Sequence, residues 1–199
     1  MSIGIVGSGN IGSAFARTLA RAGVEATIAN SRGPASLEDL VRELGPSIKA
    51  GTREEAAGAE IVLVAVNWTR LPSALAGLPA WGDRIVIDAN NPIEAPLFKP
   101  LDLNGRASSE VFAGLVPGAR VVKAFNHLQA HVLAGDPQAE GGRRVLFYSS
   151  DDPAAKAEVG ALIERLGFFG IDLGSLAAGA RLVQFPGGPL PVHNLVRFG

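Results

Sequence analysis

The sequence predicts an α/β fold: a doubly wound, mainly parallel sheet with helices on both faces and a short C-terminal extension. Short apolar segments rich in β-branched residues alternate with segments of helical periodicity along most of the chain. A glycine-rich turn joins the first predicted strand to the first predicted helix. With 199 residues, the chain is long enough to bury a substantial core.

The predicted strands are short apolar runs, which is typical of strands buried in a parallel sheet. They span residues 3–6, 25–29, 61–66, 84–88, 120–124, 144–148 and 168–172, with a short strand at best at 48–50. Because these runs alternate with helical segments, sequential strands are expected to lie parallel, joined by crossover helices.

The predicted helices have apolar residues at helical spacing and recognisable ends. The first runs over 11–22 and ends at Gly23. Ser36 is a plausible N-cap for a helix to about residue 44, and Asp151 or Asp152 caps one over 153–166 with Pro153 at its favoured first position. Residues 71–78 and 109–116 are also predicted to be helical.

Composition narrows the possible functions. Hydrophobic residues make up 47% of the chain and the formal net charge is −1, so we expect neither nucleic acid nor a membrane as partner. No cysteine is present, which excludes disulfides and thiolate chemistry. The chain begins directly on a strand pattern, so we expect no signal peptide and a cytoplasmic protein.

The strongest motif is Gly7-Ser8-Gly9-Asn10-Ile11-Gly12, a complete G-x-G-x-x-G. It follows a predicted buried strand and opens an amphipathic helix, which is the context that a dinucleotide-binding Rossmann-type fold requires. Gly7 permits the tight turn, Gly9 lets the backbone approach a pyrophosphate, and Gly12 lets helix and strand pack closely. The helix N-terminus then offers free N–H groups and partial positive charge to the phosphates.

The end of the second strand indicates NADP rather than NAD. NAD proteins usually place an acidic residue here, whereas this chain has Asn30-Ser31-Arg32. Arg32 brings a permanently charged planar donor and Ser31 a hydroxyl donor. Hydrogen bonds to charged groups contribute roughly 1.5–3 kcal/mol each, so two favour NADP by at least about a hundredfold.

Further motifs complete a resemblance that covers nearly the whole chain. They are Val66-Asn67-Trp68, Lys123-Ala124-Phe125-Asn126 and the stretch 172–182 with the apolar tail behind it. With the glycine loop and Asn30-Ser31-Arg32, they make the chain resemble the NADPH-dependent reductases of coenzyme F420, a deazaflavin. That group includes small bacterial dinucleotide-binding reductases and the cytosolic domain of the metal-reducing STEAP proteins.

The resemblance implies hydride transfer between NADPH and a flavin-like or deazaflavin acceptor stacked in the cleft. From the order of strands and helices, we expect an NADP-binding core over residues 1–125 and an extension over 126–199 that completes the sheet and closes the substrate cleft. The implied cofactor contacts are Ser8 to Ile11 at the pyrophosphate, Ser31 and Arg32 at the 2′-phosphate, Ala65, Val66 and Asn67 along the ribose and nicotinamide, and Ala124 to His127 at the nicotinamide side. We expect Trp68, Asn91, His127 and Leu128 to line the acceptor pocket.

Hydride transfer between two rings needs orientation and dryness more than acid–base groups. Two rival dehydrogenase classes are excluded. The short-chain class needs Tyr-x-x-x-Lys, but the only tyrosine, Tyr148, is followed four residues later by Asp152. The β-hydroxyacid class needs a large helical second domain, and too few residues follow the last predicted strand.

Several roles stay open on the sequence alone. His127 is either a wall residue or a proton donor, and no metal role is expected for it with His131. Asn90 and Asn91, in a proline-rich loop over 90–104 that includes Pro96, either form a turn or contact the cofactor. Trp68 covers the cofactor or packs against the tail, and Lys123 is an ion-pair partner or a substrate anchor.

The C-terminal tail is too apolar for a free end. Its apolar residues are expected to line a substrate pocket and to form a homodimer interface. Two other functions remain alternatives: an NADPH-dependent reductase of a small carbonyl-type substrate with His127 as proton donor, and a non-catalytic NADP(H) sensor.

Overall fold

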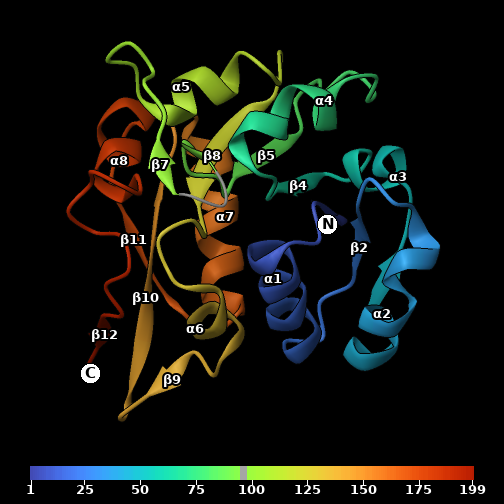
Figure 1. Ribbon diagram of the computed structural model, residues 1–199. Helices are drawn as coiled ribbons and strands as arrows, with labels where there is room; N and C mark the ends of the chain where they lie inside the picture. The colour runs from blue at the N-terminus through green and yellow to red at the C-terminus, as the bar shows by residue number, and fades with distance from the viewer. Residues whose placement is uncertain (95–97) are drawn as a thin grey trace.

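A computed structural model of the chain describes residues 1–94 and 98–199 (Figure 1). Pro96 of the predicted loop lies outside the described residues. The predicted α/β fold is confirmed: one central, mostly parallel sheet runs across the molecule, from β11 on one side to β3 on the other, with helices on both faces (Figure 1).

The main sheet has the strand order β11-β10-β8-β5-β4-β1-β2-β3. Its strands are β1 (Ile3–Val6), β2 (Ala26–Ala29), β3 (Ile48–Ala50), β4 (Ile61–Val64), β5 (Ile85–Asp88), β8 (Arg120–Ala124), β10 (Gly142–Ser149) and β11 (Phe169–Asp172). Neighbours are parallel except at β10, which runs antiparallel to β8 with Tyr148 opposite Ala124. The strand order reverses direction at β1, so the loops after β1 and β4 diverge there and leave room for a ligand.

Two groups of helices cover the two faces. Buried side chains of α1 (Asn10–Arg21), α6 (Ala130–Ala134) and α7 (Pro153–Arg165) share one core cluster, with α2 (Glu38–Leu44) packed against it. The second cluster contains buried side chains of α3 (Arg53–Ala57), α4 (Leu71–Leu75), α5 (Ser108–Ala113) and α8 (Leu176–Val183). In the first cluster, the rings of Phe15 and Phe125 lie 4.8 Å apart between centroids.

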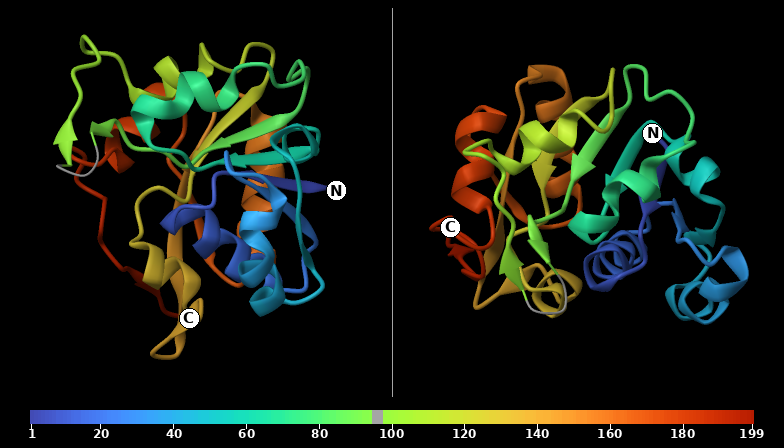
Figure 2. Two further views of the ribbon diagram at one scale, coloured as in Figure 1. Left: turned by 45° about the vertical axis from the view of Figure 1, so that its right-hand side comes forward. Right: turned by 45° about the horizontal axis from the view of Figure 1, so that its top comes forward.

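Short elements complete the chain. Two 3-10 turns, η1 (Pro34–Leu37) and η2 (Trp68–Arg70), precede α2 and α4, and β6 (Ile93–Glu94) pairs with β7 (Lys99–Pro100) inside the predicted 90–104 loop. The strands β9 (Gln138–Ala139) and β12 (Val196–Arg197) both pair with the beginning of β10. This part projects from the rest of the molecule with the C-terminus beside it (Figure 2).

Local departures from the sequence predictions have clear causes. Ser36 is not the N-cap of α2, because it lies within η1. Its hydroxyl accepts a hydrogen bond from the Asn30 amide and donates one to the carbonyl of Gly33. Helix α3 was not predicted, although Thr52 and Glu55 form a complete capping box at its start. Helix α8 was likewise hidden in the apolar tail, where Ser175 caps it by accepting from the N–H of Ala178. Within the described residues, no helix is long and apolar enough to cross a membrane.

Candidate active site

The glycine loop has the geometry that the motif predicts. Gly7 has φ +109°, and a Cβ there would lie 2.2 Å from the carbonyl oxygen of Ala65. A Cβ on Gly12 would lie 1.8 Å from the carbonyl oxygen of Gly7, so α1 packs directly on the turn. Gly9 has no heavy atom within 4 Å of a Cβ built on it, and therefore the loop is open on this side. The fold therefore requires glycine at positions 7 and 12, whereas position 9 is left open for a ligand to approach.

Helix α1 presents an uncompensated N-terminus at this loop. Its N-cap Gly9 provides no side-chain hydrogen bond, and no acidic residue lies in the first turn. The first intrahelical bond runs from the N–H of Ser13 to the carbonyl of Gly9, which leaves the preceding N–H groups without intrahelical acceptors. An anion at this end would receive several backbone hydrogen bonds and the favourable helix dipole.

Asn30, at the end of β2, connects the glycine loop to the next loop. Its amide nitrogen donates to the hydroxyl of Ser8 at 3.1 Å and to that of Ser36 at 2.9 Å. Its amide oxygen accepts from the backbone N–H of Arg32 at 2.8 Å. Asn30 therefore fixes the positions of the two loops relative to each other, and the side chains of Ser31 and Arg32 are exposed beside it.

A cleft of about 410 Å³ opens at the carboxyl ends of these strands. Nine of the predicted cofactor-binding residues line it, contributed by the loops after β1, β2 and β4: Gly7, Ser8, Gly9, Asn30, Ser31, Arg32, Ala65, Val66 and Asn67. A dinucleotide fits this donor set, because the open glycine loop and the exposed Arg32 provide anion sites at separate points of one cleft.

The comparisons with known proteins agree with this geometry. Residues 2–92 match the family model described as coenzyme F420-dependent NADP oxidoreductase. A crystal structure from Arthrobacter sp. FB24, described as a candidate F420-dependent NADP reductase, is 31% identical, covers 88% of this chain and 86% of that chain, and has a TM-score of 0.74. The chain belongs to this family of NADP-dependent oxidoreductases.

Two further relatives extend the comparison. A hypothetical protein from Sinorhizobium meliloti is 46% identical over 99% of this chain and 96% of that chain, with a TM-score of 0.94. Metalloreductase STEAP3 of Rattus norvegicus is 30% identical over 92% of this chain. The chain spans only 36% of the length of that STEAP relative. Reductive aminases at about 22% identity share the fold.

The other site residues predicted from the sequence do not line this cleft. Asn10, Ile11 and Gly12 belong to the first turn of α1, beside or beneath the loop. Asn90, Ala124, Asn126 and Leu128 are buried. Trp68 is 9% exposed and packs in the core cluster around α4 and α5. The Trp68 side chain is therefore part of the core and does not line the cleft.

The buried Asn90 and the half-buried Asn91 organise the loops after β4, β5 and β8. The amide oxygen of Asn90 accepts from the backbone N–H of Val66 at 2.8 Å, which fixes the inner end of the cleft. Asn91 and Asn126 exchange hydrogen bonds at 2.9 Å each, side-chain amide to carbonyl and side-chain amide to side-chain oxygen. Asn126 also donates to the carbonyl of Val183 at 2.7 Å, so this network attaches α8 to the central sheet.

Lys123 and Asp88 stabilise the same network through hydrogen bonds to Asn90. Lys123 Nζ lies 3.1 Å from Asp88 Oδ2 and also donates to the carbonyl of Asn90. Asp88 accepts from the hydroxyl of Ser109 at 2.7 Å and from the side-chain amide of Asn90 at 2.8 Å. Lys123 is thus an ion-pair partner in the core, which settles the alternative between ion pair and substrate anchor.

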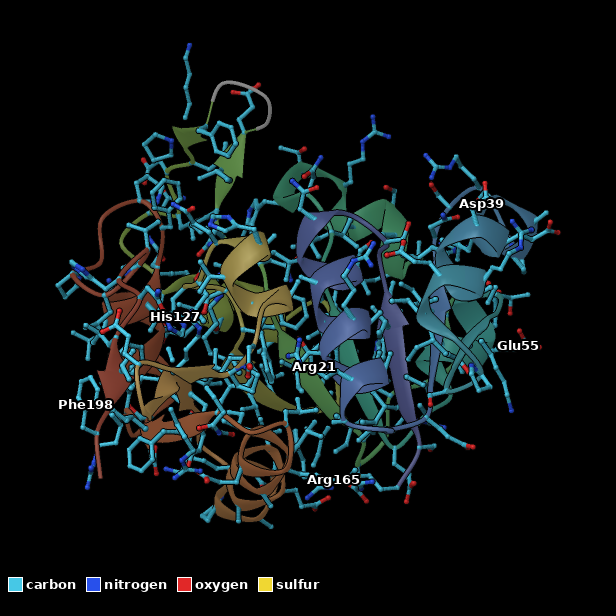
Figure 3. The ribbon with its side chains drawn as sticks, turned by 90° about the horizontal axis from the view of Figure 1, so that it is seen from below. Arg21, Asp39, Glu55, His127, Arg165 and Phe198 are labelled. Carbon is cyan, nitrogen blue, oxygen red and sulfur yellow. The ribbon has the colours of Figure 1, made fainter. Side chains whose placement is uncertain are left out.

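His127 is buried and uncharged. It is 2% exposed, and its ring lies 4.9 Å from that of Phe147. Neither ring nitrogen has a well-aligned hydrogen-bond partner among the described residues, and burial lowers the pKa of His127 to about 4 against a weaker opposing effect of the Val145 backbone. Figure 3 shows His127 on the C-terminal side of the molecule, across from Asp39 and Glu55 at α2 and α3.

The tail beyond α8 is anchored at a few points. The backbone N–H of Val192 donates to the carbonyl of His127 at 2.7 Å, and β12 pairs with β10. Leu195 and Phe198 are 44% and 56% exposed, and Phe198 lies at the edge of the molecule in Figure 3. The expected homodimer through this tail stays a prediction.

Sequence reasoning missed two arginines of the cleft. Arg53, the first residue of α3, and Arg70, at the end of η2, both line it together with Arg32. Arg53 was missed because α3 was not predicted, although the Thr52 and Glu55 capping box could have revealed it. For Arg70 no sequence signal was available. No group of His, Cys, Asp or Glu side chains in the described part of the chain could hold a metal ion.

Proposed function

We propose that this protein is an oxidoreductase that transfers hydride between NADPH and a flavin-like or deazaflavin acceptor. The observation that supports the proposal most strongly is that the open glycine loop, whose Gly9 is the N-cap of α1, and Arg32 line one cleft. The family match supports NADP as cofactor. The identity of the acceptor rests on the resemblance and on the neutral state of His127, which does not line the cleft.

The chain's own residues would bind and orient the cofactor. The N–H groups at the start of α1 would bind the pyrophosphate, and Ser31 and Arg32 the 2′-phosphate. Val66, held by Asn90, would fix the inner end of the cleft where the nicotinamide is expected. When bound, the nicotinamide supplies the hydride, and the protein supplies orientation and exclusion of water.

The state of His127 favours a ring acceptor over a carbonyl substrate. Carbonyl reduction needs a proton donor near the developing alkoxide. With its pKa lowered to about 4 by burial, the His127 imidazole is neutral near pH 7, and its side chain does not line the cleft. A flavin-like ring needs no such donor, because its charge can spread over the ring system.

The test is a spectrophotometric assay of NADPH oxidation with coenzyme F420, FMN, FAD and a set of small carbonyl compounds. We expect turnover with a flavin or the deazaflavin, a strong preference for NADPH over NADH, and loss of that preference in Arg32→Ala. Turnover only with a carbonyl compound, abolished in His127→Ala, would establish the small-substrate alternative. NADPH binding without turnover on any acceptor would leave the sensor.

A further inference from the structure

Three arginines from three different parts of the chain line the cleft. Arg32 follows β2, Arg53 follows β3 and Arg70 lies in the turn after β4. Strands β2 and β4 flank β1 in the sheet, so Arg32 and Arg70 approach the cleft from opposite sides of the glycine loop. No acidic side chain lines the cleft in the described part of the chain. The cleft is therefore cationic, although the whole chain has a net charge of −1.

Arg53 is held in place by the protein itself. Its Nη1 donates to the carbonyl of Ala74 at 3.1 Å and to that of Ser73 at 3.4 Å, at the end of α4. Its Nη2 lies 3.5 Å from a carboxylate oxygen of Glu54, and the side chain is only 31% exposed. A guanidinium has five N–H donors in a fixed plane, so donors remain for a further acceptor. Arg53 thus presents a preorganised cation at the cleft.

Arg32 and Arg70 are different, because both are exposed and neither forms an ion pair among the described residues. Guanidinium groups that share one cleft repel each other, and an anion between them turns the repulsion into attraction. Guanidinium planes also stack on aromatic rings. A ligand group that combines an aromatic base with a doubly charged phosphate matches both properties.

We propose that Arg53 and Arg70 are specificity-determining residues that, with Arg32, clamp the adenosine 2′-phosphate of NADP(H). The inference rests on the proposed function, because it assumes that the cleft binds NADP(H). Arg53 is the fixed contact, and Arg32 and Arg70 close on the phosphate from opposite sides. The 2′-phosphate is the one group that distinguishes NADP from NAD, so all three arginines contribute to cofactor choice.

The test uses two fragments and calorimetry, which needs no acceptor. Adenosine 2′,5′-bisphosphate contains the 2′-phosphate, whereas adenosine 5′-monophosphate lacks it. For Arg53→Gln and Arg70→Gln, we expect about tenfold weaker binding of the bisphosphate and a change below about twofold for the monophosphate. The matched control is Arg42→Gln, because Arg42 is an exposed arginine on α2 that pairs with Asp39 outside the cleft. It should change neither affinity.

Salt dependence provides a second readout. Binding of the bisphosphate should weaken less with added salt in Arg70→Gln than in the unsubstituted protein, because one charge contact is gone. If Arg53→Gln fails to fold, Arg70→Gln decides the question, since the Arg70 side chain is exposed. Unchanged bisphosphate affinity, or an equal loss for both fragments, would overturn the clamp. Failure of the unsubstituted protein to bind NADPH would refute the proposed function itself, whereas binding without turnover would leave the clamp intact.

Discussion

Lys123 and Asp88 form a completely buried ion pair, with Nζ 3.1 Å from Oδ2, at the carboxyl ends of β8 and β5. Burial lowers the pKa of Lys123, and the carboxylate of Asp88 opposes this shift. Both charges have further partners, because Lys123 donates to the carbonyl of Asn90 and Asp88 accepts from Ser109. The pair therefore holds the loop after β5 against the loop after β8.

Removing the lysine alone should leave a buried carboxylate without its cation. We expect Lys123→Met to lower the free energy of unfolding by about 3–5 kcal/mol, measured by urea denaturation at pH 7. The double variant Lys123→Met with Asp88→Asn should recover part of this loss, because no unpaired charge remains. The explanation fails if the double variant is no more stable than Lys123→Met.

Asn30 offers a direct test of cofactor choice at the end of β2. In Asn30→Asp the acceptor for the Arg32 N–H remains, but a negative charge is placed beside the expected 2′-phosphate. NADPH should bind at least about tenfold more weakly, while NADH is affected less or binds better, since a carboxylate there accepts from a ribose 2′-hydroxyl. Fluorescence titration with both cofactors measures the ratio.

Asn30→Ala is the control for this substitution. It removes the hydrogen bonds to Ser8 and Ser36 without adding charge, so NADPH and NADH should lose affinity by similar factors. A drop in the NADPH-to-NADH ratio that is equally large in both variants would show that loop geometry, not charge, sets the preference.

The cofactor end of the cleft was predictable because its residues are local in the sequence. Gly7 to Gly12 and Asn30 to Arg32 each follow a strand directly, and parallel strands deliver their following loops to one edge of the sheet. Nine residues predicted as cofactor contacts line one cleft for this reason. Whether they contact NADP(H) stays a prediction.

The remaining parts of the site were not predictable, because their contacts are long-range. Asn126 donates to the carbonyl of Val183, which is distant along the chain. Arg53 donates to a carbonyl at the end of α4, but it lies on α3, a helix too short to show an apolar periodicity in the sequence. The antiparallel direction of β10 also depends on where its connection crosses, which periodicity does not encode. Trp68 was predicted to line the acceptor pocket because its motif resembles a family pattern, but its indole packs in the core.

His127 should make the fold sensitive to acid. Its pKa is lowered from 6.5 to about 4 in the folded protein, so the unfolded chain binds more protons between these values. The free energy of unfolding that depends on a neutral His127 is fully present above pH 6.5 and is lost as the pH falls toward 4. Between pH 7 and pH 5 we expect a loss of about 2 kcal/mol.

The measurement is urea denaturation of the unsubstituted protein and His127→Leu at pH 7 and pH 5. Other titrating groups contribute equally to both proteins, so the difference between them isolates His127. In His127→Leu the decrease in unfolding free energy should be smaller by about 2 kcal/mol. Equal decreases in the two proteins would mean that His127 is accessible to protons in the folded state.

Gly9 and Gly12 should separate cofactor binding from folding within one motif. A Cβ on Gly12 would overlap the carbonyl oxygen of Gly7, so Gly12→Ala must shift α1 and should cost about 1–3 kcal/mol of stability. A Cβ on Gly9 meets nothing within 4 Å, and Gly9 has an ordinary φ of −72°. Gly9→Ala should therefore fold with stability within about 0.5 kcal/mol of the unsubstituted protein.

The same Gly9→Ala methyl group would stand at the open side of the loop where the pyrophosphate is expected, so NADPH affinity should fall at least about tenfold. Thermal unfolding and NADPH titration of the two variants measure both effects. Gly9→Ala with unchanged stability and unchanged NADPH affinity would show that the pyrophosphate does not approach this loop. Such a result would favour phosphate contacts at the arginines that line the cleft, Arg32, Arg53 and Arg70, over contacts at the glycine loop.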